Sequence, residues 1–153
     1  MNKNGDVPLG ETDIRALLNE FASTERTDDF FLEHGTQDFL FIRPSGNPLD
    51  AEEFSDMFKS GDITIHDAEF VALERLNFHG NVAIAVFIMK GSFTYQGRAN
   101  SDTYAATALL RNVDGEWKFA LFQRSSGATD LSSWQAFSSK NLTLEKEGLR
   151  LSP

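Results

Sequence analysis

Apolar residues recur at helical spacing near the start of the chain. From Glu11 to Ser23 they fall at i, i+3, i+4 and i+7, which predicts an amphipathic helix with Thr12 or Asp13 as its cap. The residues of the apolar face are Ile14, Leu17, Leu18 and Phe21. This helix is therefore expected to pack one face on a core.

Two shorter helices are predicted before residue 62. Residues 28–34 begin with two acids and stop at Gly35, which suits the helix dipole and a left-handed glycine cap. Asp50 is expected to cap the other helix, which ends at Ser60-Gly61. Its apolar positions are Phe54, Met57 and Phe58.

A short run and four long runs are rich in β-branched and aromatic residues. They are Gln37–Arg43, Ile63–Phe78, Val82–Tyr95, Ala99–Val113 and Trp117–Ser125. The long runs are separated by hairpin sequences, which are His79-Gly80-Asn81, Gln96-Gly97 and Asp114-Gly115. Helices ahead of an antiparallel meander predict an α+β fold, because a parallel doubly wound sheet would alternate strands with helices.

Two of the predicted strands are apolar on both faces. Val82–Met89 is apolar throughout, and Trp117–Phe122 carries apolar residues at both odd and even positions. An antiparallel sheet with one face in water should alternate apolar and polar residues. Because the helices can cover only one face, we expect the outer face to meet a second copy of the chain in a two-fold homodimer.

The length and the net charge of the chain limit the classes of protein to which it can belong. The chain has 153 residues, no cysteine and a formal net charge of −9. This length suggests one domain, and the acidic balance disfavours nucleic acid as a partner. Residues 1–10 are polar and lack the apolar run of a secretory signal, and no later run is long enough for a membrane span, so we expect a soluble, cytoplasmic protein without a membrane partner.

The chain is expected to divide into three parts. Residues 1–10 are predicted to be disordered, residues 11–127 to form the domain, and residues 128–153 to form a partly helical tail. Asp130 is a candidate cap for a tail helix that carries Leu131, Trp134 and Phe137 at helical spacing. This helix either packs on the domain or lies as an arm on a partner subunit.

The order of these elements resembles a known superfamily. The last strand opens with Asp114-Gly115-Glu116-Trp117-Lys118 and closes with Gln123-Arg124-Ser125-Ser126-Gly127, and an earlier turn reads Phe41-Ile42-Arg43-Pro44-Ser45-Gly46. Over Asp13–Gly127 the pattern is similar to the nuclear transport factor 2-like superfamily, in its SnoaL-like branch and near the association domain of calcium/calmodulin-dependent protein kinase II. The resemblance implies a cystatin-like fold, in which a strongly curved antiparallel sheet surrounds a conical cavity capped by the helices, usually in a homodimer.

The resemblance also implies which residues line the cavity. If Arg124 faces inward, as the matching arginine of the association domain does, strand alternation turns Phe122 and Ala120 inward as well. The expected ligand-binding residues are Arg124, Phe122, Tyr104, Phe87, Met89, Met57 and Phe58. Further arginines and histidines of that domain are replaced here, at Ala108, Met89, Leu121 and Gln123, so its anion pocket is not preserved.

Arg124 raises the main chemical question. A guanidinium is always charged, so in an apolar cavity it needs an anion beside it. Two kinds of anion could pair with Arg124. One is the carboxylate or phosphate of a ligand, and the other is an internal acid such as Asp38, Asp102 or Glu69 in a structural ion pair.

Four residues are candidates for general acid–base catalysis: Asp102, Tyr104, Asp38 and His66. Asp102 and Tyr104 share strand parity, whereas His66 and the adjacent Asp67 point to opposite faces and cannot form a dyad. A catalytic carboxylate would need a pKa raised by burial. No spacing of acids and histidines indicates a metal site, and no cofactor is implied.

These observations favour a homodimeric protein that binds a small, largely apolar molecule, with or without an acidic group. An enzyme is disfavoured because positions used for catalysis elsewhere in the superfamily hold other residues here, namely Ala106, Ala108, Leu121 and Gln123. Two alternatives stay open. One is a cofactor-free lyase or isomerase that uses Asp102 or Asp38 with Tyr104, and the other is an assembly module that forms oligomers larger than a dimer.

Overall fold

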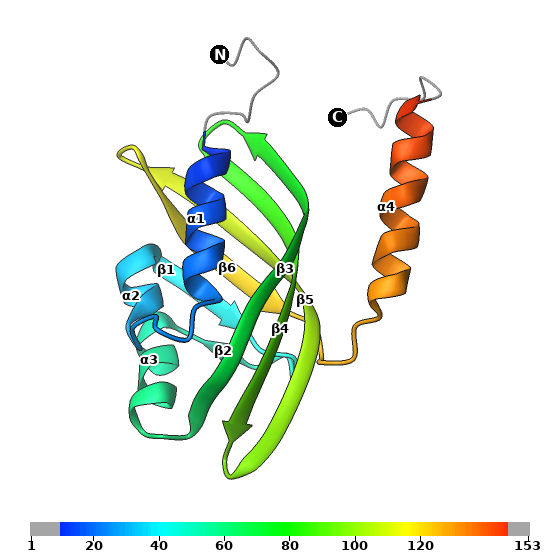
Figure 1. Ribbon diagram of the computed structural model, residues 1–153. Coiled ribbons are helices and arrows are strands. Elements are labelled where there is room, and N and C mark those ends of the chain that lie inside the picture. Colours follow the sequence, from blue (N-terminus) through cyan, green and yellow to red (C-terminus); the bar gives the residue numbers. More distant parts are fainter. Residues whose placement is uncertain (1–9, 147–153) are drawn as a thin grey trace.

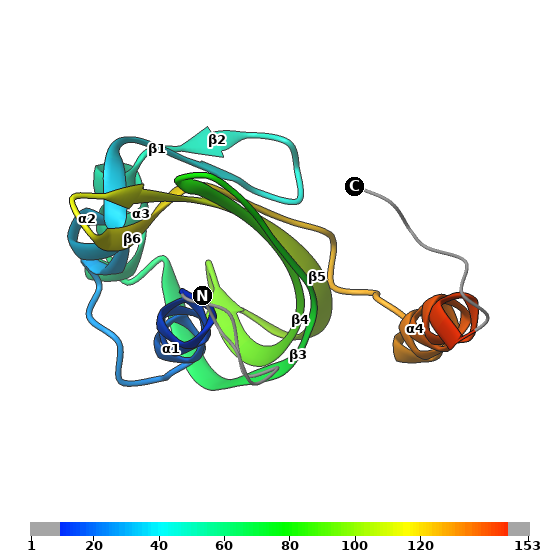
Figure 2. The same ribbon diagram turned by 90° about the horizontal axis from the view of Figure 1, so that it is seen from above.

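The computed structural model describes residues 10–146, without the side chains of residues 141–146. Its main element is a curved sheet. Three helices lie on its concave side and one beyond its other side (Figures 1 and 2). The helices are α1 (Glu11–Phe21), α2 (Phe30–His34), α3 (Ala51–Lys59) and α4 (Leu131–Lys146). The strands are β1 (Gly35–Ile42), β2 (Pro48–Leu49), β3 (Ile63–His79), β4 (Val82–Tyr95), β5 (Arg98–Val113) and β6 (Glu116–Arg124). The predicted α+β class is confirmed.

The sheet is mixed, with the strand order β2-β1-β6-β5-β4-β3. Strands β3 to β6 form the predicted antiparallel meander. β1 runs parallel to β6, with Phe41 beside Phe122. The sheet is therefore antiparallel except at this pair, where the last strand of the meander runs alongside β1 in the same direction.

Tight turns join the strands of the meander at the predicted positions. Gln96 and Gly97 both have positive φ, at 50° and 80°, as do Asp114 and Gly115, at 53° and 88°. Two consecutive residues of positive φ match the twist of the flanking strands and favour glycine. Consequently β3 to β6 begin and end within one residue of their predicted bounds.

The start of α1 differs from the prediction. The residue before the helix is Gly10, with φ 94°, and its carbonyl accepts from the Ile14 N–H at 2.9 Å. No side chain caps this end. Thr12 and Asp13 lie inside the helix, so neither is its cap.

The ends of α2 and α3 show two kinds of helix boundary. Gly35 follows α2 in an extended conformation, with φ −103°, and not in the predicted left-handed one. A Cβ atom there would collide with the carbonyl oxygen of Phe31, so a close backbone approach explains this glycine. Asp50 caps α3 as predicted, because its Oδ1 accepts from the Glu53 N–H at 2.8 Å and Glu53 Oε1 accepts from the Asp50 N–H at 2.9 Å.

Phenylalanine side chains fill one end of the concave face. Phe31 of α2 is fully buried at the centre of this aromatic cluster. Its ring centroid lies 4.2–6.1 Å from those of seven others, which are Phe21, Phe30, Phe39, Phe41, Phe54, Phe119 and Phe122. The cluster joins α1, α2, α3, β1 and β6, so it is the contact that fixes the helices on the sheet.

A register shift in β6 changes which of its residues reach this cluster. Leu109 lies opposite Leu121, but Leu110 lies opposite Phe119, so the strand bulges between them. Phe119 therefore joins the core, and Ala120, which was expected to face the cavity, lies outside the core cluster. The bulge lets Phe119 and Phe122 both face the core, so the apolar residues at odd and even positions of this strand do not by themselves indicate a partner.

Register shifts also bend β3. They occur between Ile65 and Asp67, between Phe70 and Ala72, and between Leu73 and Arg75. Bulges bend a strand and increase its twist. In Figure 2 the sheet accordingly curls around α1.

Helix α4 lies on the opposite side of the sheet from α1 (Figures 1 and 2). Asp130 Oδ1 accepts from the Ser132 N–H at 3.0 Å at its start. Ser138 Oγ donates to Glu74 Oε1 of β3 at 2.7 Å, and Phe137 is 45% exposed. The helix thus touches the sheet without joining the core.

The structure does not describe residues 1–9, for which disorder is predicted, or residues 147–153. Of the helices that are described, none has the length and apolar character that crossing a membrane requires.

The aromatic cluster predicts a large difference between two neighbouring residues. Phe31→Ala should lower the free energy of unfolding by about 3–5 kcal/mol, because it leaves a cavity among seven rings. Leu32→Ala should change it by less than about 0.5 kcal/mol, because Leu32 is 48% exposed. Urea unfolding followed by circular dichroism measures both, and equal losses would contradict the central role of Phe31.

Candidate functional site

A pocket of about 520 Å³ occupies the part of the concave face that the aromatic cluster leaves open. The loop after α1, helix α3, the turn after β1 and the ends of β3, β4 and β5 form its walls. Its aromatic lining includes Phe21, Phe41, Phe54, Phe58 and Phe93. Pockets of this volume with apolar walls are typical sites for small organic molecules.

Five of the seven predicted ligand-binding residues line the pocket. They are Arg124, Tyr104, Met89, Met57 and Phe58. Phe87 and Phe122 lie in the core instead, where both are fully buried and their rings are 5.6 Å apart. They contribute to the packing that supports the pocket and not to its surface.

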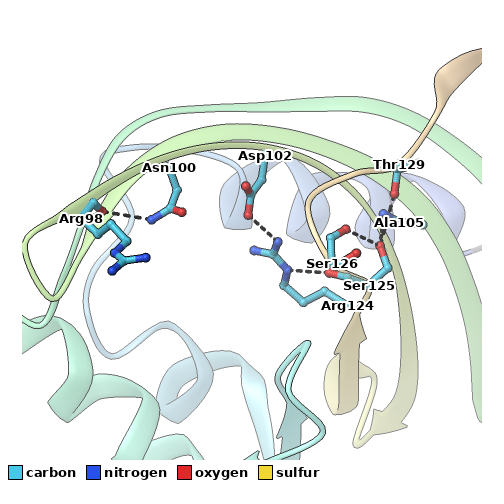
Figure 3. A network of polar contacts seen from close by, with 8 residues as sticks. All are labelled: Arg98, Asn100, Asp102, Ala105, Arg124, Ser125, Ser126 and Thr129. Atoms are coloured by element: carbon cyan, nitrogen blue, oxygen red, sulfur yellow. Dashed lines mark hydrogen bonds and ion pairs between the residues drawn. The ribbon is translucent and has the colours of Figure 1, made fainter.

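Arg124 already has an internal partner. Its Nη2 donates to Asp102 Oδ2 at 2.8 Å, and its Nε donates to the Ser125 carbonyl at 3.1 Å (Figure 3). The side chains of Arg124 and Asp102 are only 13% and 20% exposed, and the guanidinium carbon lies 3.8 Å from the centre of the Tyr104 ring. Of the two partners left open by the sequence, the structure contains the internal acid.

The segment after β6 holds this ion pair in place. Ser125 N–H donates to the Ala105 carbonyl at 2.8 Å, and the Ala105 N–H donates to Ser125 Oγ at 3.1 Å. A Cβ atom at Gly127 would collide with the carboxyl group of Asp102. Glycine at this position therefore leaves the room that the ion pair needs.

Asp38 and His66 lie outside the pocket lining. Asp38 is 71% exposed, and the Thr36 hydroxyl together with the charge of Arg111 lowers its pKa. His66 is exposed, with its Nε2 2.8 Å from the hydroxyl of Thr94. In the described part of the chain, no three acidic or histidine side chains come close enough to hold a metal ion.

Tyr104 presents a neutral phenol to the pocket. It is 8% exposed, and burial raises the pKa of its hydroxyl, although the positive charges of Arg124 and Arg26 act in the other direction. None of the hydrogen bonds found among the described residues involves this hydroxyl. The group is thus able to donate a hydrogen bond to a bound molecule.

The sequence analysis missed Arg26, which lines the pocket from the loop between α1 and α2. Its Nη1 donates to the Phe21 carbonyl at 2.6 Å. Its guanidinium carbon lies 4.6, 5.7 and 5.0 Å from the ring centres of Phe21, Phe54 and Phe58. A basic residue after a helix is common, because it donates to the last carbonyls, but this signal does not indicate a pocket.

Arg26 keeps its charge without an ion pair. Burial lowers its pKa to about 10, with smaller opposing effects of Tyr104 and Asp28, so the side chain is charged at neutral pH. The six ion pairs between described residues do not include it. The faces of three aromatic rings stabilise this charge in place of a carboxylate.

The pocket is positive in an acidic protein. Four cationic residues line it, and two acids, Asp67 and Asp102, oppose them, which leaves a net charge of +2. The cationic residues are Arg26, Arg43, Lys90 and Arg124. The whole chain carries −9, so the pocket is a local reversal of the overall charge.

Comparison with known proteins identifies the family. Residues 10–135 match a family described as "Protein of unknown function (DUF3804)". The chain belongs to this family. No match to a curated protein was found.

Solved structures confirm the resemblance stated above. An NTF2-like (nuclear transport factor 2-like) protein of unknown function from Prochlorococcus marinus is 44% identical, with a TM-score of 0.78, over 83% of this chain and 100% of that one. A putative Ca/calmodulin-dependent kinase II association domain from Exiguobacterium sibiricum is 17% identical, with a TM-score of 0.69, over 82% and 98%. A ketosteroid isomerase-like protein from Erwinia carotovora atroseptica is 17% identical, with a TM-score of 0.64, over 83% and 100%. The chain therefore has the NTF2-like, cystatin-like fold.

The ion pair between Asp102 and Arg124 predicts that substitutions of the two residues have non-additive effects on stability. Asp102→Asn and Arg124→Met should each lower the free energy of unfolding by about 2 kcal/mol, because each leaves a half-buried charge unpaired. The double variant should lose clearly less than the sum of the two. Asp38→Asn is the control, since its exposed pair with Arg111 is screened by water and should add little to stability. Additive losses in chemical unfolding would contradict the pairing.

Proposed function

We propose that this protein binds a small, largely apolar molecule in the pocket. The observation that carries the proposal is an aromatic-lined volume of about 520 Å³ that the side chains of the core leave unfilled. Apolar walls bind by removing apolar ligand surface from water, and a few polar groups orient the ligand. Tyr104 is such a group, since its hydroxyl is able to donate to the bound molecule.

Binding is preferred to the alternative of a lyase or isomerase. A general base must be within hydrogen-bond reach of the proton that it removes. The carboxylate of Asp102 is engaged by Arg124, and neither Asp38 nor His66 lines the pocket. The ketosteroid isomerase-like neighbour is 17% identical, so its likeness concerns the fold alone.

The proposal predicts that the pocket takes up a neutral aromatic probe. N-phenyl-1-naphthylamine should bind the wild-type protein saturably, with an increase in fluorescence. Ala68→Trp places an indole on the pocket wall and should weaken this binding at least about tenfold, which corresponds to roughly 1.4 kcal/mol.

The matched control is Ala136→Trp, the same substitution at an exposed position of α4. It should bind the probe as the wild type does. An absence of saturable binding in the wild type, or equal binding by Ala68→Trp, would refute the proposal.

We further propose that the outer face of the sheet joins two copies of the chain. Ile84, Leu109 and Leu121 are cross-strand neighbours on β4, β5 and β6 and form a half-buried apolar row. The association-domain neighbour is 17% identical and shares the fold, so oligomers larger than a dimer are kept as the alternative. The cytoplasmic location stays a prediction from the sequence.

The dimer proposal predicts a change of mass in one variant. Multi-angle light scattering should give the wild type twice the chain mass of 17.1 kDa. Leu109→Lys should be monomeric, because it places a charge in the centre of the apolar row. Asn19→Lys adds the same charge to the exposed side of α1 and should remain a dimer. A monomeric wild type would overturn the proposal, and a larger oligomer would favour an assembly module.

A further inference from the structure

We propose that Arg26 and Tyr104 form an anion subsite in the pocket, so that the ligand is an amphipathic carboxylate with an apolar body. This inference rests on the proposed binding function and identifies its ligand class. It assigns the anchoring role to a residue that neither the hydrophobic pattern nor the resemblance indicated. The charge that was expected to bind the ligand, on Arg124, is engaged by Asp102.

The orientation of Arg26 leaves hydrogen-bond donors available. Its guanidinium carbon lies 4.6 Å from the centre of the Phe21 ring and 5.0 Å from that of Phe58, and one nitrogen donates to the Phe21 carbonyl at 2.6 Å. A guanidinium has five N–H groups, and a carboxylate accepts two of them at once. The remaining N–H groups have no acceptor among the described hydrogen bonds.

Tyr104 supplies the second donor. Its side chain lies on the pocket wall and is affected by the charges of both Arg26 and Arg124. Arg124 is packed against the face of its ring, 3.8 Å from the centre. The hydroxyl has no partner among the described hydrogen bonds and lines the same pocket as Arg26, so it is available to an anion bound there.

The surrounding residues decide the class of ligand. Arg43 and Lys90 add positive charge to the lining, with Lys90 exposed, which raises the local concentration of anions in an otherwise acidic protein. Among the four lining cations, Arg26 is the one that contacts three aromatic rings and has no ion pair with a described residue. One anchored charge beside an aromatic wall fits a monocarboxylate with an apolar body better than a polyphosphate.

The test uses two probes that differ only in charge. 1-Naphthylacetate and its neutral amide, 1-naphthylacetamide, compete with N-phenyl-1-naphthylamine for the full-length protein. The wild type should bind the carboxylate roughly 10- to 100-fold more tightly than the amide, as expected for charge-assisted hydrogen bonds. Arg26→Gln removes the charge and should abolish this preference, so that the acid and the amide compete equally.

Two further variants complete the design. Arg15→Gln removes the same charge from an exposed position on α1 and should keep the full preference for the carboxylate. Tyr104→Phe keeps the ring beneath Arg124 and should reduce the preference several-fold. If Arg26→Gln does not fold, an unchanged preference in Tyr104→Phe is sufficient to overturn the inference.

The outcomes separate the two proposals. If the neutral reporter does not bind the wild type, the proposed binding function fails, and the anion subsite fails with it. If the reporter binds but the acid and the amide compete equally, or if the preference survives in Arg26→Gln, only the anion subsite is wrong. Loss of the preference in Arg15→Gln as well would show a general charge effect and would also overturn it.

Discussion

The packing of phenylalanine rings at one end of the concave face is the interaction on which the rest of the structure depends. Bulges bend the sheet, and the bent sheet forms a concave face beneath the three helices. The rings around Phe31 fill one end of that space and attach α1, α2 and α3 to β1 and β6. The other end stays open as the pocket.

The edge of the aromatic cluster is also the wall of the pocket. Phe21, Phe41 and Phe54 pack on buried rings and line the open volume. Arg26 lies against two of these rings, so the packing that stabilises the fold also positions the charge. A guanidinium held in this way needs no carboxylate from the protein, which leaves its N–H groups for a ligand. The same side chains therefore stabilise the fold and line the pocket that we propose as the binding site.

Most of the fold was predictable because its signals are local. Turn residues such as Asp114-Gly115 mark the ends of strands, and the capping box of Asp50 and Glu53 marks the start of α3. The parallel pairing of β1 with β6 was not predictable in this way, because its partners are far apart in the sequence. The bulge near Ala120 was also not predicted, because a strict alternation of inward and outward side chains does not allow for an extra residue in one strand.

The site shows the same division between local and tertiary information. Strand parity correctly indicated that Asp102 and Tyr104 share a face, and Asp102 was one of three acids named as possible partners of Arg124. It could not choose the acid, because Gly127, in the segment after β6, provides the room for that pair. Arg26 has no periodic context at all, since it follows a helix in a polar loop. Its role depends on the groups that stabilise its charge. These groups are aromatic rings of α1 and α3, whereas an argument from the sequence would search for an acid. A half-buried charge without an ion pair to a described residue is thus a tertiary property, because it depends on rings that separate segments of the chain bring together.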